Sequence, residues 1–319
     1  MKTNKVLVMG MLAAAFMCSC SSEEEPATAG SLKAIQASAG IGQSSRAVID
    51  ADYGSDLNVS FVRMDHPEAG DAVWNSPSID AVRTGGAGNT VLTFEPEQTY
   101  LTPDGETVLV GYYPRKAPDS GTTNPVNVSY TITGDDDIMA TDVQTGSLVE
   151  KFKAFTFSHL LTQLQFKCTG SAGAISKWTS ITSIKVKDVS TSLTLSLDKT
   201  DGASLAATGT ADQVLAVANC PTVVSGTETA DPKIGYLMLY PVADMGTATT
   251  AINLEVVATY EGGDKTLTVP ITNISGGIKA GYSHLVTLTF TEDGKIVVEA
   301  GIAEWEPGNG GSSPVVPGT

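Results

Sequence analysis

The chain consists largely of short runs rich in β-branched and aromatic residues, separated by clusters of Gly, Asn, Asp and Pro. After the first twenty residues, no four-turn stretch carries apolar residues at helical spacing. This pattern is typical of an all-β sandwich rather than of alternating strands and helices. The runs that we expect to form strands are 32–42, 57–64, 90–94, 107–113, 126–132, 181–189, 192–198, 213–218, 234–240, 252–260, 265–272, 283–290 and 295–305.

An acidic, irregular segment at 134–150 separates these runs into two series. The run 152–168, "FKAFTFSHLLTQLQFKC", opens the second series, and the chain then offers around seven short strands per half at the spacing of a β-sandwich. We therefore expect two sandwich domains in tandem, 47–150 and 151–305. The Gly- and Pro-rich end, 306–319, is expected to be a flexible tail.

The N-terminal segment 1–19 has the features of a secretory signal. Two lysines precede the apolar stretch 6–17. Twelve residues are too few to cross ~30 Å of hydrocarbon as a helix, so the stretch is excluded from the fold.

The end of this signal resembles that of bacterial lipoproteins, in which a cysteine is acylated and becomes the first mature residue. Cys20 follows the small Ser19 and is the preferred lipidation site, whereas Cys18 follows the bulky Met17. An ordinary signal with incidental cysteines is the third alternative. The next residues, "SSEEE", resemble the export tag of surface lipoproteins in Bacteroidales-type bacteria, so we expect the chain at the cell outer membrane, exposed on the surface.

The charge of the chain excludes some partners. Two of its 19 basic residues lie in the signal, which leaves 17 against 35 acidic residues. No lysine or arginine cluster is present, so neither nucleic acid nor anionic lipid is expected to bind by charge. The acidic surface suits a soluble extracellular protein.

Two cysteines remain after the signal, Cys168 and Cys220. The exported compartment permits a disulfide between them. A bridge requires their Cα atoms to lie about 4.4–6.8 Å apart, which a sequence does not give. A bridge and two separate buried thiols both stay open.

No catalytic motif is present, and we expect neither enzymatic activity nor a cofactor. The three histidines, His66, His159 and His284, are interpreted as structural. Ser158 and His159 are neighbours on a predicted strand and would point to opposite faces, so they do not form a nucleophile with its base.

Three carboxylates alternate around Gly54, at Asp50, Asp52 and Asp56. Oxygen ligands at this spacing are weak candidates for a Ca²⁺ site. A solvated turn before the strand at 57–64 is the preferred interpretation.

Several segments together resemble the fimbrillin family, the subunits of Bacteroidales-type (type V) pili. They are "LVGYYPR" (109–115), "DIMAT" (137–141), "FTFSHLLTQLQFK" (155–167), "GYLMLYP" (235–241) and "IKAGYSHLVTLTFTEDGKIVVEAGIAEWEPG" (278–308). The resemblance implies two transthyretin-like β-sandwiches. It also implies a lipoprotein precursor that an arginine-specific surface protease cuts near its N-terminus. The first strand then leaves, and a C-terminal strand of another pilin subunit takes its place.

Arg46 fits that cleavage. The sequence "SSRAV" places one basic residue between the weak strand 32–42 and the body of the domain. We expect the cut between Arg46 and Ala47, which would discard the lipid-anchored propeptide 20–46. The alternative is an exposed arginine in a loop.

The expected donor strand is 295–305, because apolar residues alternate along it. One face carries Ile296, Val298, Ala300 and Ile302, and the other includes Trp305. The segment alternatively belongs to this chain's own second sandwich, in which case the chain accepts a strand without donating one.

The sequence thus favours a structural subunit of a fimbria that polymerises by donor-strand exchange. The second hypothesis is a non-polymerising or tip-located surface adhesin that binds glycan or host protein. A surface hydrolase is the third, and would need a convergence of residues that the sequence does not reveal.

Overall fold

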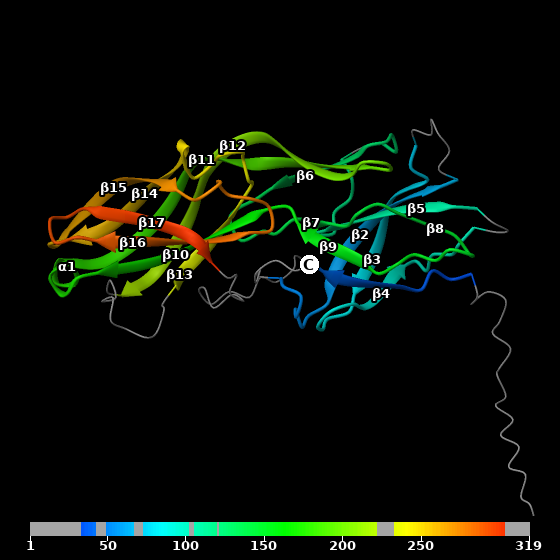
Figure 1. Ribbon diagram of the computed structural model, residues 1–319, viewed down its shortest axis with the longest axis horizontal. Coiled ribbons are helices and arrows are strands. Elements are labelled where there is room, and N and C mark those ends of the chain that lie inside the picture. Colours follow the sequence, from blue (N-terminus) through cyan, green and yellow to red (C-terminus); the bar gives the residue numbers. More distant parts are fainter. Residues whose placement is uncertain are drawn as a thin grey trace, which may run out of the picture.

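A computed structural model describes residues 33–42, 49–66, 73–101, 105–119, 121–221 and 233–303. The described chain is all-β apart from one short helix, α1 (Ala172–Lys177). Figure 1 shows an elongated molecule with two groups of strands, one at each end. The strands of the first group, in chain order, are β1 (Ala37–Ile41), β2 (Leu57–Asp65), β3 (Ser76–Arg83), β4 (Thr90–Glu95), β5 (Thr107–Tyr113), β7 (Met139–Ala140), β8 (Gln144–Gly146) and β9 (Phe155–His159).

These eight strands form one sheet in the order β2-β3-β4-β1-β9-β7-β5-β8. An additional pairing between β2 and β5 closes the path on itself, so seven of the strands form a ring. Every second side chain of a strand points into the ring, as in β4 and β9. These buried side chains are mostly apolar, so the interior of the ring is apolar. Its core holds an aromatic group that includes Phe61, Phe94, Phe155 and Phe157.

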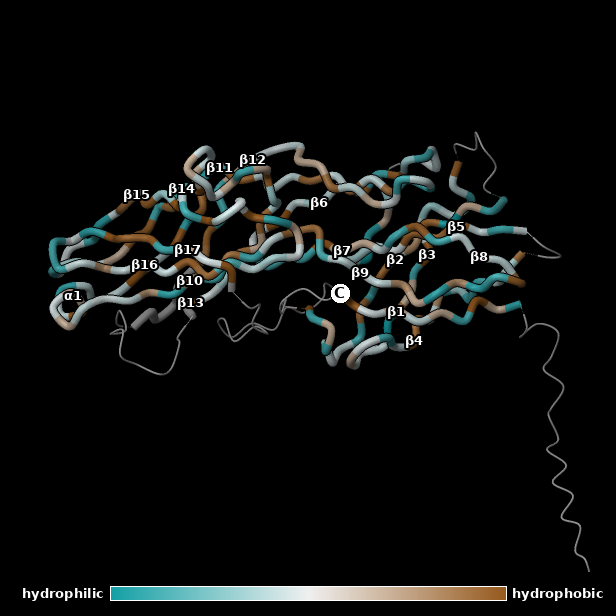
Figure 2. The backbone as a smooth tube through the Cα atoms, in the orientation of Figure 1, coloured by the Kyte–Doolittle hydropathy of each residue, from teal (hydrophilic) through white to brown (hydrophobic). Residues whose placement is uncertain are grey.

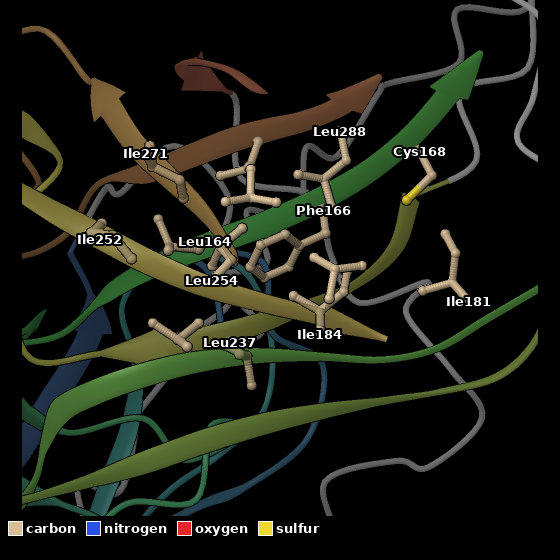
Figure 3. Close-up of a cluster of buried hydrophobic side chains, with 14 of the residues drawn as sticks. Leu164, Phe166, Cys168, Ile181, Ile184, Leu237, Ile252, Leu254, Ile271 and Leu288 are labelled. Carbon is tan, nitrogen blue, oxygen red and sulfur yellow. The ribbon is translucent and has the colours of Figure 1, made fainter. Parts of the chain in front are cut away.

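The second group forms a sandwich of two sheets. One sheet has the order β13-β10-β16-β17, and the other β12-β11-β14-β15 with β6 beside β11. The bounds of these strands are β6 (Val126–Thr131), β10 (Thr162–Gly170), β11 (Trp178–Asp198), β12 (Gly202–Pro221), β13 (Lys233–Leu239), β14 (Thr247–Tyr260), β15 (Gly263–Asn273), β16 (Ser283–Phe290) and β17 (Ile296–Ala303). Leucine, isoleucine and phenylalanine side chains from both sheets meet in the core between them (Figure 3).

A long hairpin joins the two groups. β11 and β12 extend from the sandwich toward the ring, and the outer part of β11 pairs with β6 (Figure 1). A third core lies at this junction and combines residues of the ring, such as Val62 and Val110, with Leu193 and Leu195 of β11. Figure 2 shows hydrophobic stretches along the strands of both groups. The two groups therefore share buried surface and are not separated by a bare linker.

The all-β prediction is confirmed, and most expected strands are found. The runs 181–189 and 192–198 form the single strand β11, with shifts of register between them that absorb extra residues. β9 lies after residue 150 yet pairs with β1 in the ring, so ring strands continue past the expected domain boundary. Among the described residues, no helix is both long and apolar enough to cross a membrane.

Candidate functional site

The strand β1 lies inside the ring sheet, with a neighbour on each side. It runs antiparallel to β4, with Ala37 opposite Leu92, and parallel to β9, with Ile41 opposite Phe157. The backbone N–H of Gly42 donates to the Phe157 carbonyl at 2.7 Å, which extends the pairing by one residue. Because strands lie about 4.8 Å apart, loss of β1 would leave a gap about two strand spacings wide between β4 and β9.

The side chains of β1 match the expectation for 32–42. Ile35, Ala39 and Ile41 are buried, and Ala37 packs against the same core. They face the aromatic group, in which the Phe61 ring lies 5.2 Å from the Phe94 ring and 5.0 Å from the Phe155 ring. Removing the two isoleucines would expose an apolar slot, at a cost of about 1.5–3 kcal/mol for each side chain.

Arg83 at the end of β3 holds β1 in place. Its side chain is fully buried, and its Nε donates to the Ala39 carbonyl at 3.1 Å. One terminal nitrogen donates to the carbonyls of Gly86 and Gly88, at 2.7 and 2.9 Å. Burial lowers the pKa of the guanidinium below its usual value. A buried cation held only by carbonyls among the described residues is sensitive to the loss of any of them.

Sequence reasoning missed Arg83, although a signal was present. Ile79, Ala81 and Arg83 follow each other at every second position, so the arginine continues the inward face of β3. An arginine on an apolar face indicates a buried polar contact.

A second close contact lies beside Arg83, at Gly40. A Cβ atom added at Gly40 would lie 2.4 Å from the Asn89 Oδ1 and 3.5 Å from the Gly88 carbonyl oxygen. Asn89 is exposed, so a larger residue at position 40 requires only that the end of the Asn89 side chain move.

The expected donor segment forms β17, which pairs antiparallel with β16 of its own sheet. Ile296, Val298 and Ala300 pack against the sandwich core, as the alternation predicts. Ile302 does not follow them and is 68% exposed, because it lies at the end of this edge strand. Trp305 lies outside the described residues.

The remaining predicted sites are dispersed. Cys18, Cys20, Arg46 and Ala47 lie outside the described residues, as does the side chain of Cys220. Cys168 is buried in the sandwich core (Figure 3). A bridge to Cys220 and two separate thiols both stay open, as in the sequence analysis.

Two of the aspartates around Gly54 accept hydrogen bonds from backbone N–H groups of the surrounding loops. The Asp56 Oδ1 accepts from the Gly85 N–H at 2.8 Å, and the Asp50 Oδ1 accepts from the Asp52 N–H at 3.0 Å. No group of three potential metal ligands occurs in the part of the chain that the structure describes.

Ser158 and His159 point to opposite faces of β9, as predicted. Ser158 is exposed, whereas the buried His159 ring has its Nδ1 2.7 Å from the Asp137 carboxylate. The contact between His159 and Asp137 joins β9 to the segment that precedes β7.

A polar hollow of ≈ 640 Å³ lies outside the ring, against β3 and β4. Arg115 reaches across it, 3.4 Å from the Asp80 carboxylate and 3.7 Å from that of Glu95. Lys116 also lines the hollow. The hollow is separate from the inner face of β1, and both acidic and basic side chains line it.

Solved structures of similar shape come from several Bacteroidales species. A protein from Bacteroides uniformis with a suggested role in cell adhesion is 18% identical, and the match covers 86% of this chain and 97% of that chain with a TM-score of 0.59. A protein of the same description from Bacteroides ovatus is 20% identical over 86% of this chain and 98% of its own, with a TM-score of 0.56. No curated protein matches significantly.

The chain therefore shares the all-β fold of these structures. The sequence profile of the family described as Fimbrillin-like matches residues 67–305. The chain belongs to this family.

Proposed function

We propose that this chain is a subunit of a surface fimbria that polymerises by strand exchange. In this proposal the precursor is exported as a lipoprotein anchored through Cys20, and a surface protease cuts it after Arg46. The residues that are cut away include β1, and a strand of another subunit then fills the slot between β4 and β9. The ring and the sandwich are the two transthyretin-like domains of the subunit, with their junction between β9 and β10.

The placement of β1 carries the proposal. β1 is paired on both sides, its Ile41 and the preceding Ile35 lie in the ring core, and it precedes Arg46 in the chain. A sheet that loses an inner strand exposes unpaired N–H and C=O groups on two neighbours, together with an apolar groove. Only an extended strand can pair with both exposed edges and fill the groove between them.

The other three arginines support Arg46 as the cleavage site. Arg63 and Arg83 are buried, and Arg115 donates to the Ala81 carbonyl at 2.7 Å. A protease needs an extended, accessible segment, which arginines fixed in this way do not offer.

Limited digestion of the purified full-length precursor with trypsin tests the proposal. The expected result is a new N-terminus at Ala47 and a ladder of oligomers that resists SDS at low temperature, because two-sided backbone pairing makes release slow. The variant Arg46→Gln should lack this N-terminus and stay monomeric. A chain that is cut at Arg46 and stays monomeric at high concentration would rule out polymerisation by this route.

The polar hollow beside Arg115 favours the second candidate, a surface adhesin that binds glycan or host protein. Its mixed charges and half-buried arginine suit a polar ligand. This function predicts that the uncut precursor binds such ligands, and that Arg115→Ala weakens the binding at least about tenfold, the equivalent of one charge-assisted hydrogen bond.

A further inference from the structure

The polar hollow of the ring opens where two neighbouring strands diverge. β3 begins at Ser76, yet its register with β4 covers only Asp80 to Arg83. No described strand pairs with 76–79 on this side, and the hollow of ≈ 640 Å³ lies here. Its volume is within the range of about 300–1,000 Å³ that small-molecule sites in proteins have.

The floor of the hollow is the outer face of β3. Ile79 and Ala81 face the ring core, so the alternate residues Ser76, Ser78 and Asp80 face outward and line the hollow. These outward residues present two hydroxyl groups and one carboxylate, about 6.6–6.8 Å apart along the strand, which is twice its rise per residue. They offer hydrogen-bonding groups and no large apolar side chain.

Side chains on the two sides of this floor carry opposite charges. Glu95 and Gln98 come from the end of β4 and the segment after it, on one side of β3. Arg115 and Lys116 follow β5, which lies on the other side of β3, beyond β2. Together with Asp80, the hollow has two acidic and two basic side chains, so its net charge is zero.

Arg115 is held in place by the backbone around it. Its Nη2 donates to the Ala81 carbonyl at 2.7 Å, and its backbone N–H donates to the Asn58 carbonyl at 3.2 Å. Its contacts with carboxylates are longer, 3.4 Å to Asp80 and 3.7 Å to Glu95, and these two side chains are 46% and 57% exposed. Strong charge-assisted hydrogen bonds measure about 2.7–2.9 Å. Both carboxylates therefore keep room to accept hydrogen bonds from a ligand.

The charges and shape of the hollow disfavour several classes of ligand. An anion would meet the two carboxylates, a cation would meet the two basic side chains, and the whole chain carries a net charge of -16. An apolar molecule would find no large apolar side chain among the outward residues of the floor. A peptide strand could pair only poorly with 76–79, because Pro77 has no N–H to donate.

An uncharged sugar matches these groups. Each of its hydroxyl groups can donate to a carboxylate and accept from a guanidinium or ammonium group at the same time. The C–H groups of a sugar ring form an apolar face, and the exposed Pro96 and Ala117 line the hollow with small apolar surfaces. A neutral molecule also leaves the balance of charges in the hollow unchanged.

We propose that this hollow binds an uncharged sugar, with Asp80 and Glu95 accepting from its hydroxyl groups and Arg115 donating to them. The inference rests on the second candidate function, adhesion, and adds the class of ligand and the residues that recognise it. None of the residues that line the hollow belongs to β1. The site is therefore the same before and after a cut at Arg46, and it does not depend on strand exchange.

Binding of the full-length chain to an array of neutral, sialylated and sulfated glycans is the first test. We expect neutral glycans to bind, and acidic glycans to bind at least about tenfold more weakly, because the carboxylates of the hollow repel them. Titration of one bound neutral glycan, followed by NMR, then gives its Kd. Binding of acidic glycans alone, or of no glycan, would overturn the inference.

Two variants and a matched control locate the site. Asp80→Asn keeps the shape of the side chain and removes its charge, and should raise the Kd at least about tenfold. Ser78→Leu fills the floor and should have an effect of the same size. The control Thr93→Leu lies on the outer face of β4, outside the hollow, and should leave the Kd within about twofold. Ser78 and Thr93 are both exposed, so the thermal midpoints should change by less than about 2 °C.

The outcomes separate this inference from the function on which it rests. Neutral glycans that bind all three variants as they bind the original chain would leave adhesion standing and place the site elsewhere, which overturns the inference. A chain that binds a host protein and no glycan would also keep adhesion and overturn the sugar site. The trypsin assay tests strand exchange separately, so a missing ladder does not affect the result.

Discussion

Arg83 shows how one residue can connect a strand to its surroundings. It is buried without a carboxylate partner among the described residues, and it satisfies carbonyls of β1 and of the turn after β3. Each buried carbonyl that loses its hydrogen-bond donor destabilises the fold by about 1–3 kcal/mol, the cost of its desolvation. The side chain therefore contributes to the stability of the chain through β1.

Replacing Arg83 by methionine keeps the volume and removes the donors. We expect the free energy of unfolding of the full-length chain to fall by about 1–3 kcal/mol, measured by urea denaturation. Lys187→Met is the control, because Lys187 forms an exposed pair with Asp212 and should cost less than about 1 kcal/mol. Equal losses would show that Arg83 does not hold β1.

His284 gives a prediction about pH. It is buried, neither ring nitrogen has a hydrogen-bond partner among the described residues, and burial lowers its pKa below 6.5. Below about pH 6.5 the unfolded chain binds a proton that the folded histidine resists, so the free energy of unfolding decreases as the pH falls. Denaturation curves between about pH 7 and 5 should show a smaller decrease for His284→Phe. Parallel curves for the two proteins would contradict this assignment.

At the scale of elements, hydrophobic alternation predicted most of the strands but not their partners. The strand at 32–42 was predicted because every second residue from Ile35 to Ile41 is apolar (Ile35, Ala37, Ala39 and Ile41). Its place between β4 and β9 follows from pairings that lie far apart in sequence. The first half of β12 was missed because it consists of small and polar residues, "GASLAATGTAD". It is a strand because the hairpin with β11 supplies its hydrogen bonds.

β3 was missed for a related reason. Its sequence, "SPSIDAVR", contains a proline and few β-branched residues, although its second half alternates. Its partners β2 and β4 fix it in the sheet. The local sequence therefore indicates which residues of a strand face inward. Pairing with other strands determines where the strand begins and ends.

The contrast between β1 and β17 predicts the outcome of one matched pair of substitutions. Ile41→Ala removes a buried side chain and should lower the free energy of unfolding of the full-length chain by about 2–4 kcal/mol. Ile302→Ala affects an exposed side chain and should change stability by less than about 0.5 kcal/mol. Urea denaturation of both variants gives the two values. Similar losses would contradict the burial of β1.

At the scale of the whole molecule, the junction core makes the ring and the sandwich depend on each other. It contains Val62 of β2 and Leu195 of β11, both fully buried. The hairpin of β11 and β12 reaches across, and Leu193 and Leu195 of β11 pack in one core with Val62 and Val110 of the ring strands. Unfolding either group would expose apolar surface on the other, which favours a single cooperative transition.

Leu195→Ala tests this coupling. We expect calorimetry of the full chain to show one transition, and the variant to lose about 2–5 kcal/mol with the whole transition shifted downward. The control is Val149→Ala, since Val149 is 82% exposed. Two transitions, of which only one moves in the variant, would show that the groups unfold separately.

The hairpin of β11 and β12 also determines how the subunit resists pulling. These strands run along the long axis of the molecule (Figure 1), and β11 makes hydrogen bonds to β6 and β12 on its two sides. Tension applied along that axis loads these bonds in shear, so many must break together rather than one after another. A filament of such subunits would transmit a mechanical load across each subunit through a continuous strand, and its weakest points would be the joints between subunits.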